Sequence, residues 1–207
     1  MKKIMLLALV AILLSIGLLA SPMPARAATI DVDGTTCTLA DAINAANFDA
    51  PSGGCTAGSG PDTLNLTGNI TLSAALPLIA SDITIEGNNL TINGASVERV
   101  LYVHNDGATT FGSLILNQAT ITGGSTAGFG GGLYNYLGSV TVNNSTINGN
   151  SSAGGGGIAN DGGTMTVNNS TISGNTATGT AYGGGILNLN AGMLAVNNST
   201  LSGNDGN

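Results

Sequence analysis

The chain has 207 residues, including 33 Gly, and its 4 Lys and Arg residues are outnumbered by 11 Asp and Glu residues, which gives a formal net charge of -7 at pH 7. Charged residues make up 7% of the chain against about 25% in ordinary soluble domains, and the acidic balance excludes nucleic-acid binding through a basic surface. The glycines lack the three-residue period of collagen, and a hydrophobic content of 42% is too high for a disordered chain.

Residues 1–27 have the pattern of a secretory signal peptide. Two lysines precede an uncharged apolar run over residues 4–20, and residues 25–27 form an Ala-x-Ala cleavage motif. The alternative is an uncleaved membrane anchor, although the run is short for spanning a bilayer. We therefore predict cleavage between Ala27 and Ala28, with export to the outside of the cell or to its envelope. No later stretch of the sequence is long and apolar enough to cross a membrane.

Removal of this segment takes away three of the four basic residues. The mature part keeps Arg99 against all eleven acids, so its formal charge is 1 − 11 = −10. A chain with this charge is not expected to bind nucleic acid or anionic lipid headgroups.

Residues 28–63 are expected to form an N-terminal cap. The segment 38–47, TLADAINAAN, predicts a helix that begins with Thr38 as N-cap and has Asp41 three residues later. Its apolar stripe consists of Leu39, Ala42, Ile43 and Ala46.

Two cysteines, Cys37 and Cys55, border this helix and its following loop. They lack the spacing and the His neighbours of a metal site, and exported proteins oxidise their cysteines, so we predict a disulfide. The alternative is two reduced, buried thiols.

The remainder, residues 64–207, repeats a short Asn-rich unit. Asn-Asn-Ser-Thr occurs at 143–146, 168–171 and 197–200, and looser copies begin at 88 and 117. Each unit has three pieces of β character: Gly-Gly-Gly-aliphatic-x-Asn, an alternating strand that ends at the Asn pair, and Thr-aliphatic-x-Gly-Asn. Gly and Asn fit corners that need a positive φ, and stacked Asn side chains can hydrogen-bond along the stack.

Stacking these units aligns apolar side chains in inward columns, because alternation at period two sends every second residue to the same face. The expected columns are Leu116, Val142, Val167 and Val196; Leu114, Val140, Met165 and Leu194; Ile92, Ile121, Ile147, Ile172 and Leu201; and Leu133, Ile158 and Ile186. One coil cannot offset its own ordering entropy, whereas a stack can. The repeats therefore predict an all-β parallel β-helix of about five or six coils, with three strands per coil.

The last unit stops at Asn207, where the next Gly-Gly-Gly piece is due. An exposed terminal rung is an open sheet edge. We therefore expect that this region is truncated at its C-terminus, and that a missing C-terminal region or a partner covers the last coil.

The Gly-Gly-x pieces at 131–133, 156–158 and 184–186, with the aliphatic-x-x-Asn pieces of the third repeat element, resemble the repeats of bacterial polymorphic outer membrane proteins. The segment CTLADAINAAN is similar to the Cys-Ser-Leu-Arg-Glu-Ala-Ile module that opens many such proteins, with Ala40 in place of its Arg. The resemblance implies a right-handed β-helix and a secreted or surface-displayed stalk or adhesin-like domain, with no reaction attached.

Parallel β-helices also include carbohydrate-cleaving enzymes, which need a base, carboxylates and often a cation for an acidic sugar. Glu98, Arg99, His104 and Asp106 form the one cluster of such residue types in the mature chain and are weak site candidates. The alternative is a solvated pair at a corner and a loop histidine. We predict no catalytic residue, no metal site and no cofactor.

Two further sets of residues are candidate binding surfaces. Tyr134, Tyr136 and Tyr182 are candidate contacts, but the sequence predicts no repeated aromatic column that could stack on sugars. The column Thr120, Thr146, Thr171 and Thr200 is similar to the Thr arrays of ice-binding solenoids, although the neighbouring strand column is irregular.

These observations favour an exported, non-catalytic surface protein, adhesin-like or a structural stalk, whose partner is a surface glycan or protein. The alternative is a fragment of a carbohydrate-active β-helix, either lyase-like or hydrolase-like or sugar-binding. An ice-binding solenoid is a minor alternative.

Overall fold

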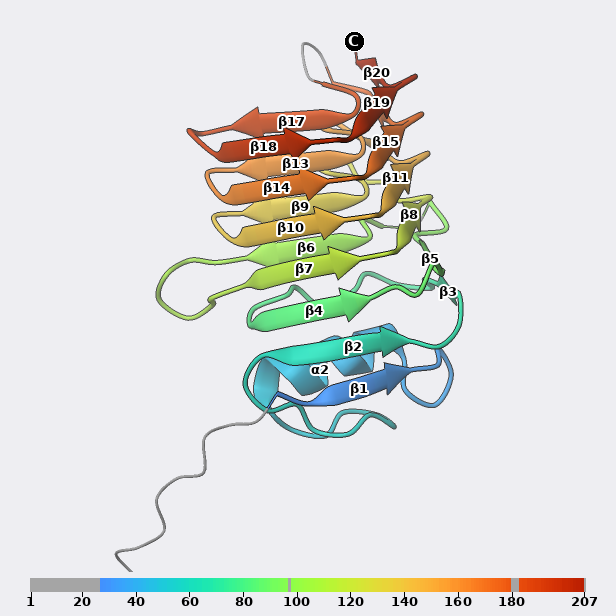
Figure 1. The fold of residues 1–207 in the computed structure, drawn as a ribbon, viewed down its shortest axis with the longest axis vertical. Helices are drawn as coiled ribbons and strands as arrows, with labels where there is room; N and C mark the ends of the chain where they lie inside the picture. The colour runs from blue at the N-terminus through green and yellow to red at the C-terminus, as the bar shows by residue number, and fades with distance from the viewer. Residues whose placement is uncertain (1–26, 97, 180–182, 207) are drawn as a thin grey trace, which may run out of the picture.

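The computed structural model describes residues 27–96, 98–179 and 183–206, which form a parallel β-solenoid of about four turns. Figure 1 shows its strands stacked in layers, with β1 and α2 at one end and β17 to β20 at the other. The predicted signal peptide, apart from Ala27, and Tyr182 lie outside the described residues. Among the described residues, no helix is both long enough and apolar enough to cross a bilayer.

Four sheets run along the solenoid, and all their strand pairs are parallel. Sheet 1 contains β1 (Thr29–Val32), β2 (Asp62–Leu66), β4 (Asp82–Glu86), β7 (Ser113–Asn117), β10 (Ser139–Asn143), β14 (Thr164–Asn168) and β18 (Met193–Asn197). Sheet 2 contains β3 (Ile70–Thr71), β5 (Thr91–Asn93), β8 (Thr120–Thr122), β11 (Thr146–Asn148), β15 (Thr171–Ser173) and β19 (Thr200–Ser202). Sheet 3 contains β12 (Ser151–Ser152), β16 (Thr176–Ala177) and β20 (Asp205–Gly206). Sheet 4 contains β6 (Leu101–His104), β9 (Leu133–Tyr136), β13 (Ile158–Asp161) and β17 (Ile186–Leu189).

The repeats predicted five or six coils, more than the about four turns of the structure. They also predicted three strands per coil, fewer than the later coils have. Sheet 4 begins at β6, preceded only by an isolated parallel bridge between Ile79 and Val103 in the described chain, so the first rungs of sheets 1 and 2 belong to incomplete coils. In the later coils the short strands of sheet 3 follow sheet 2, which gives four strands per turn.

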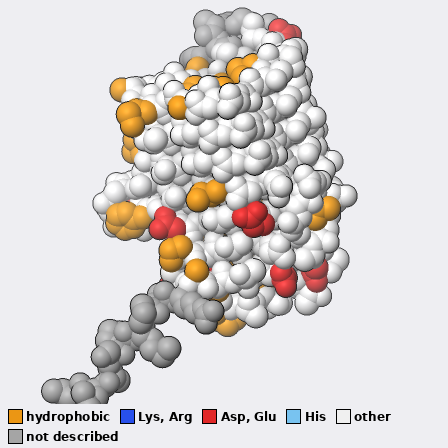
Figure 2. Space-filling model, in the orientation of Figure 1, with side chains coloured by type: hydrophobic (Ala, Val, Ile, Leu, Met, Phe, Trp, Pro, Cys, Tyr) orange, Lys and Arg blue, Asp and Glu red, His pale blue; other side chains and the backbone are white. Residues whose placement is uncertain are grey.

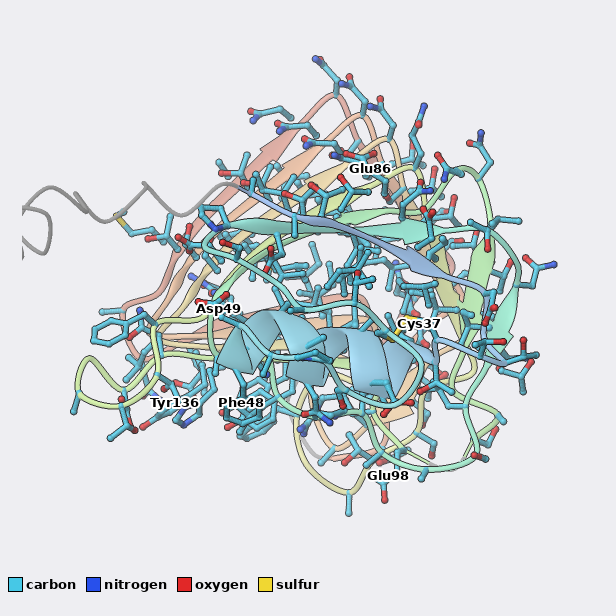
Figure 3. All side chains as sticks on the ribbon, turned by 90° about the horizontal axis from the view of Figure 1, so that it is seen from below. Cys37, Phe48, Asp49, Glu86, Glu98 and Tyr136 are labelled. Carbon is cyan, nitrogen blue, oxygen red and sulfur yellow. A yellow bond between two sulfur atoms is a disulfide. The ribbon has the colours of Figure 1, made fainter. Side chains whose placement is uncertain are left out.

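The four inward columns are confirmed by the strand register. Val142 pairs with Leu116 and Val167, and Ile147 pairs with Ile121 and Ile172, all of them fully buried. Figure 3 shows the inward side chains filling the space between the sheets. Each fully buried aliphatic side chain contributes about 1.5–3 kcal/mol. The columns therefore form one continuous core as far as the last coil, where Ile186 and Leu194 are partly buried and Val196 and Leu201 are exposed.

Asparagine ladders join the coils, as the repeat predicts. On the outside, Asn168 Nδ2 donates to Asn143 Oδ1 at 2.9 Å. Inside the solenoid, the fully buried Asn175 accepts from Asn150 Nδ2 at 3.0 Å. The corner residue Asn169 has a φ of 49°, a left-handed conformation that Asn tolerates better than most residues. The Asn-x-Ser/Thr sequons of the repeat thus coincide with its corners.

The predicted N-terminal helix is present as α2 (Leu39–Phe48), one residue later than expected. Thr38 Oγ1 accepts from the Asp41 backbone N–H at 3.1 Å, and Asp49 ends the helix in a left-handed conformation. The expected apolar stripe is buried, and α2 contacts β1, β2 and β4. The predicted disulfide joins Cys37 to Cys55 across a Cα–Cα distance of 4.7 Å.

Candidate functional site

The outer surface of sheet 4 carries a two-rung ladder of aromatic rings. In β6, Leu101 and Val103 face inward, so Tyr102 and His104 face outward; in β9 the outward residues are Tyr134 and Tyr136. The register pairs Tyr102 with Tyr134 and His104 with Tyr136. Their ring centroids lie 5.0 and 5.2 Å apart in stacked geometry. All four rings are half-buried, which leaves one side of the ladder open to solvent.

Arg99 lies against the same rings. Its Cζ is 5.2 Å from the Tyr102 ring centroid and 4.8 Å from that of Tyr134, within the range of cation–π attraction. Its Nε donates to the carbonyl oxygens of Phe129 and Gly130 at 2.9 and 3.0 Å, which fixes the guanidinium over the ladder. Burial lowers the pKa of Arg99, and the tyrosines and Glu98 oppose this shift. Because an Arg guanidinium stays protonated in proteins, the ladder keeps a fixed positive charge.

A buried carboxylate supports the ladder from the next coil. Asp161, at the end of β13, is 7% exposed, and its Oδ2 accepts from the Tyr134 hydroxyl at 2.8 Å. Asn190 Nδ2 donates to the other oxygen at 2.6 Å. Burial, followed by the hydrogen bond to Asp161, raises the pKa of Tyr134 well above its usual value, and burial also raises the pKa of Tyr102. Both phenols therefore remain neutral hydrogen-bonding groups at physiological pH. We name Arg99, Tyr102, His104, Tyr134 and Tyr136 the aromatic face.

Two of the four site candidates from the sequence belong to this face. Arg99 and His104 both contact Tyr102, the latter edge-on at 5.6 Å between ring centroids. His104 Nδ1 also shares a 2.8 Å hydrogen bond with Thr110 Oγ1. These two candidates thus lie in one cluster, whose other members are aromatic rings and not carboxylates.

The other two candidates lie elsewhere. Glu98 is exposed at the start of the coil and points outward (Figure 3). Asp106 organises its own loop, since Oδ1 accepts from the backbone N–H groups of residues 108–110 and Oδ2 accepts from Thr109 Oγ1 at 2.6 Å. The Thr109 hydroxyl and these amides lower the pKa of Asp106. This carboxylate is already satisfied by local hydrogen bonds.

The expectation of no repeated aromatic column was wrong for the coils of β6 and β9. Tyr102 was missed because its strand lacks the Gly-Gly start and the Asn that mark the other strands of sheet 4. The available signal was the shared pattern Leu-Tyr-x-aromatic in residues 101–104 and 133–136, with His in the last position of the first copy.

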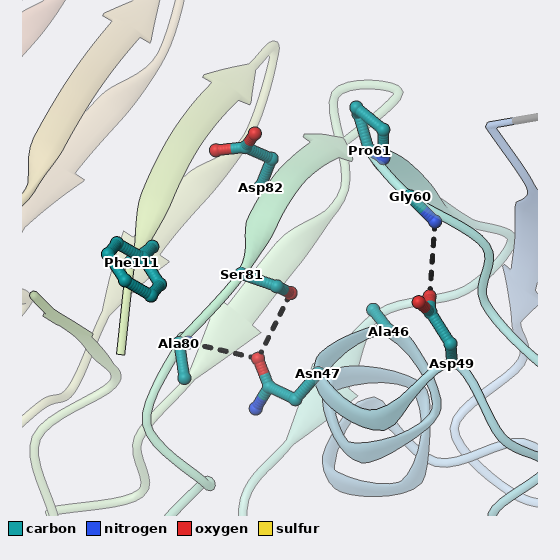
Figure 4. Close-up of a pocket in the computed structure, with 9 residues that line it drawn as sticks. All are labelled: Ala46, Asn47, Asp49, Gly60, Pro61, Ala80, Ser81, Asp82 and Phe111. Carbon is teal, nitrogen blue, oxygen red and sulfur yellow. Dashed lines mark hydrogen bonds between the residues drawn. The ribbon is translucent and has the colours of Figure 1, made fainter. Parts of the chain in front are cut away.

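A cavity of about 310 Å³ lies between the end of α2 and the starts of β2, β4 and β7 (Figure 4). Two exposed carboxylates, Asp49 and Asp82, are among its lining residues. Asp49 Oδ1 accepts from the Gly60 N–H at 3.1 Å, and Asn47 Oδ1 accepts from the Ala80 N–H at 2.9 Å. These bonds join the helix to the adjacent loops. The polar groups that line this cavity therefore hold parts of the fold together.

In the part of the chain that the structure describes, no three His, Cys, Asp or Glu side chains are grouped so as to hold a metal ion. On the face shown in Figure 2, most visible acidic side chains lie over the N-terminal coils. Compared with known proteins, the chain matches no family model, no curated protein and no solved structure.

Proposed function

We propose that the chain is an exported, non-catalytic, adhesin-like protein of a bacterial surface that binds a glycan through its aromatic face. The signal-peptide pattern supports export, and the resemblance to polymorphic outer membrane proteins supports surface display on a right-handed β-helix. In this proposal, α2 and its disulfide cap the N-terminal coil. The aromatic face is the observation that carries the binding role.

The geometry of this face suits a sugar. The paired rings lie on rigid neighbouring strands, about 4.8 Å apart along the solenoid, and form a continuous apolar strip. Arg99 supplies fixed positive charge beside the strip, and the three tyrosine hydroxyls and His104 supply hydrogen-bonding groups. Such a combination of apolar platform and few polar groups is typical of ligand sites. A glycan that carries carboxylate groups matches Arg99, the one Lys or Arg side chain of the mature chain.

The placement of the carboxylates supports a role in binding and not in cleavage. A glycoside hydrolase needs two carboxyl groups across the scissile bond. Next to the aromatic face, Asp161 is hydrogen-bonded to Tyr134 and Asn190, and Asp106 is held by its own loop.

The test is binding of the mature protein to an immobilised panel of neutral and uronic-acid polysaccharides. We expect binding to the acidic glycans, with an affinity loss of at least about fivefold in Tyr136→Ala, because one stacking contact is worth about 0.5–1.5 kcal/mol beyond its buried area. Thr166→Ala, an outward residue of sheet 1, is the matched control and should bind like the wild type. Equal binding by both variants, or no binding to any glycan, contradicts the proposal.

The carbohydrate-cleaving alternative predicts new reducing ends or unsaturated sugars when the panel is incubated with the protein. Loss of such activity in Glu98→Ala or Asp106→Ala would replace the adhesin-like proposal with an enzymatic one.

The ice-binding alternative has one observation in its favour. Thr120, Thr146, Thr171 and Thr200 are stacked in register, and Thr91 extends the column by one rung. The adjacent outward column of sheet 2 contains Asn, Thr and Ser in irregular order, which breaks the array. Measurable thermal hysteresis, abolished by Thr146→Tyr, would establish this alternative.

A further inference from the structure

A buried carboxylate lies beside the predicted first residue of the mature chain. Asp62, the first residue of β2, is 1% exposed. Its Oδ1 accepts from the Ala28 backbone nitrogen at 3.1 Å and from the Ser59 N–H at 2.8 Å. Its Oδ2 is buried and has no hydrogen-bond partner among the described residues. The carboxylate is thus only half satisfied by neutral donors.

The position of Ala28 relative to Asp62 is fixed by the sheet. Ala28 directly precedes β1, whose Thr29 pairs with Thr63 of β2 in parallel register. The Thr63 N–H donates to the Ala28 carbonyl at 2.8 Å, so the bond pattern of sheet 1 extends one residue beyond β1. On the other side, a side chain at Gly58 would collide with Asp62 Oδ2 and with α2. The carboxylate therefore has little room to turn toward solvent.

A buried carboxylate requires a nearby positive charge or a full set of hydrogen bonds. The mature sequence has no lysine, and its one arginine, Arg99, lies on the aromatic face against Tyr102 and Tyr134. The cation that the mature chain can add next to Asp62 is its own amino terminus.

We propose that the Ala27–Ala28 bond is a processing site whose hydrolysis creates an α-ammonium at Ala28 that forms an ion pair with Asp62 and completes the N-terminal coil. In this step water breaks the peptide bond, its hydroxyl goes to the Ala27 carbonyl carbon, and its proton goes to the Ala28 nitrogen. One further solvent proton gives the ammonium. The catalyst is an external peptidase of the class that removes export signals.

The ion pair gives the mature protein a property that the uncleaved chain lacks. A neutral amide donates one hydrogen bond, whereas an ammonium carries a full charge and three donors. The strand β1 is then held to β2 by the ion pair between the Ala28 ammonium and Asp62 as well as by backbone hydrogen bonds. This inference rests on the proposed export, but it is independent of glycan binding, because the aromatic face lies on other coils.

Because the mature sequence has no lysine, an amine-reactive reagent can modify the amino terminus selectively. In the mature protein the Ala28 amine is the one aliphatic amine, so N-hydroxysuccinimidyl acetate reports on it alone. We compare the protein that begins at Ala28 with a form that carries a Gly-Ser extension before Ala28, at the same pH. We expect acetylation of the Ala28 form to be at least about tenfold slower, since each tenfold step equals about 1.4 kcal/mol of protection. Equal rates in the two forms overturn the proposal.

Thermal unfolding provides the second measurement. We expect the Ala28 form to melt at least about 3 °C above the extended form, because the extension removes the charge next to Asp62 and leaves the ladder with β2 in place. In the Asp62→Asn background this difference should vanish, whereas it should persist in Asp31→Asn, whose carboxylate is an exposed group of β1. A difference that survives Asp62→Asn contradicts the ion pair.

Two controls keep the outcome clear. If Asp62→Asn does not fold, wild-type protein acetylated at its terminus replaces it, and an unchanged Tm on acetylation overturns the proposal. Mass spectrometry of the exported protein must give Ala28 as the first residue; any other terminus overturns it. Retention of residues 1–27 would contradict both this inference and the proposed export, whereas failure of the ion pair with intact glycan binding would contradict this inference alone.

Discussion

The Tyr134 hydroxyl donates a 2.8 Å hydrogen bond to Oδ2 of Asp161 on the adjacent coil. Because Asn190 of the following coil donates to Oδ1 of the same carboxylate, one buried acid links three successive turns. This link holds Tyr134, and with it the aromatic face, to the two following coils.

Replacement of Tyr134 by Phe should lower the free energy of unfolding by about 1.5–3 kcal/mol, the range for a hydrogen bond to a charged group. The measurement is urea denaturation followed by circular dichroism. Tyr136→Phe is the matched control, because the described residues provide no hydrogen-bond partner for its hydroxyl, and it should change the free energy by less than about 0.5 kcal/mol. A similar loss in both variants would contradict the role of the Asp161 bond.

Stability should fall at alkaline pH. The folded state raises the pKa of Tyr134, first through burial and then through the bond to Asp161, and it also raises the pKa of Tyr102. The unfolded chain therefore loses these protons first, so their contribution is complete below about pH 10 and decreases as the pH rises further. Denaturation at several pH values should show a steeper decline in the wild type than in Tyr134→Phe. Parallel curves would contradict the assignment.

The buried Asn ladder should be costly to interrupt. Asn175 is 0% exposed; its Nδ2 donates to Ile147 O and its Oδ1 accepts from the Asn150 N–H. Asn175→Ala leaves both backbone groups unpaired and should cost about 2–6 kcal/mol, at about 1–3 kcal/mol for each orphaned group. Asn168→Ala, in the half-buried outer ladder, should cost less than about 1 kcal/mol. An equal decrease in the free energy of unfolding in both variants would contradict the prediction that the buried ladder contributes more stability than the outer one.

A glycine between coils should not accept a side chain. A Cβ on Gly156 would lie less than 3.0 Å from the carbonyl oxygens of Thr176 and Gly184 in the next coil. Gly156→Ala should therefore destabilise the protein by about 3 kcal/mol or prevent folding. Gly174→Asn is the control, because the corner Gly174 has open space around it and a φ of 61° that Asn accepts. A soluble, equally stable Gly156→Ala protein would contradict the close approach of the coils.

The Cys37–Cys55 disulfide should make both cysteines unreactive toward thiol reagents, and it should stabilise the N-terminal region. The bridge spans 18 residues, so its removal in Cys37→Ala/Cys55→Ala should cost about 3 kcal/mol in the chain-entropy model. A thiol reagent should not label the purified protein until a reductant is added. Labelling of both cysteines without reductant would contradict the bridge.

The inward columns were predictable because the side-chain period of a strand is two and identical units stack in register. Val142 and Val167 occupy equivalent places in nearly identical sequences, and the pairing of β10 with β14 follows from that identity. The strands of sheet 3 were not predictable in this way. Ser151–Ser152, Thr176–Ala177 and Asp205–Gly206 share no apolar alternation, and backbone pairing alone defines them.

The aromatic face was only partly predictable, because its residues come from a coil that departs from the repeat. Arg99 and His104 stood out by residue type, whereas the contacts of Arg99 with Tyr134 and of His104 with Tyr136 depend on the register of β6 with β9. Asp161 directly precedes Gly162, a pattern typical of exposed turns, yet the fold buries it beneath Tyr134. Loops of unequal length between the coils set these neighbours, and a repeat pattern carries no information on them.

The strict register between successive coils also determines which length changes the gene can tolerate. Asn143 and Asn168 occupy the same ladder position 25 residues apart, so an in-frame duplication or deletion of one such unit leaves every apolar column continuous. Loss of Thr166 from β14 would instead make Met165 and Val167 direct neighbours, so one of the two would face solvent, because one step reverses the face of a strand. The protein can thus change length by whole coils without loss of its core, whereas a change of one residue within a strand disrupts it.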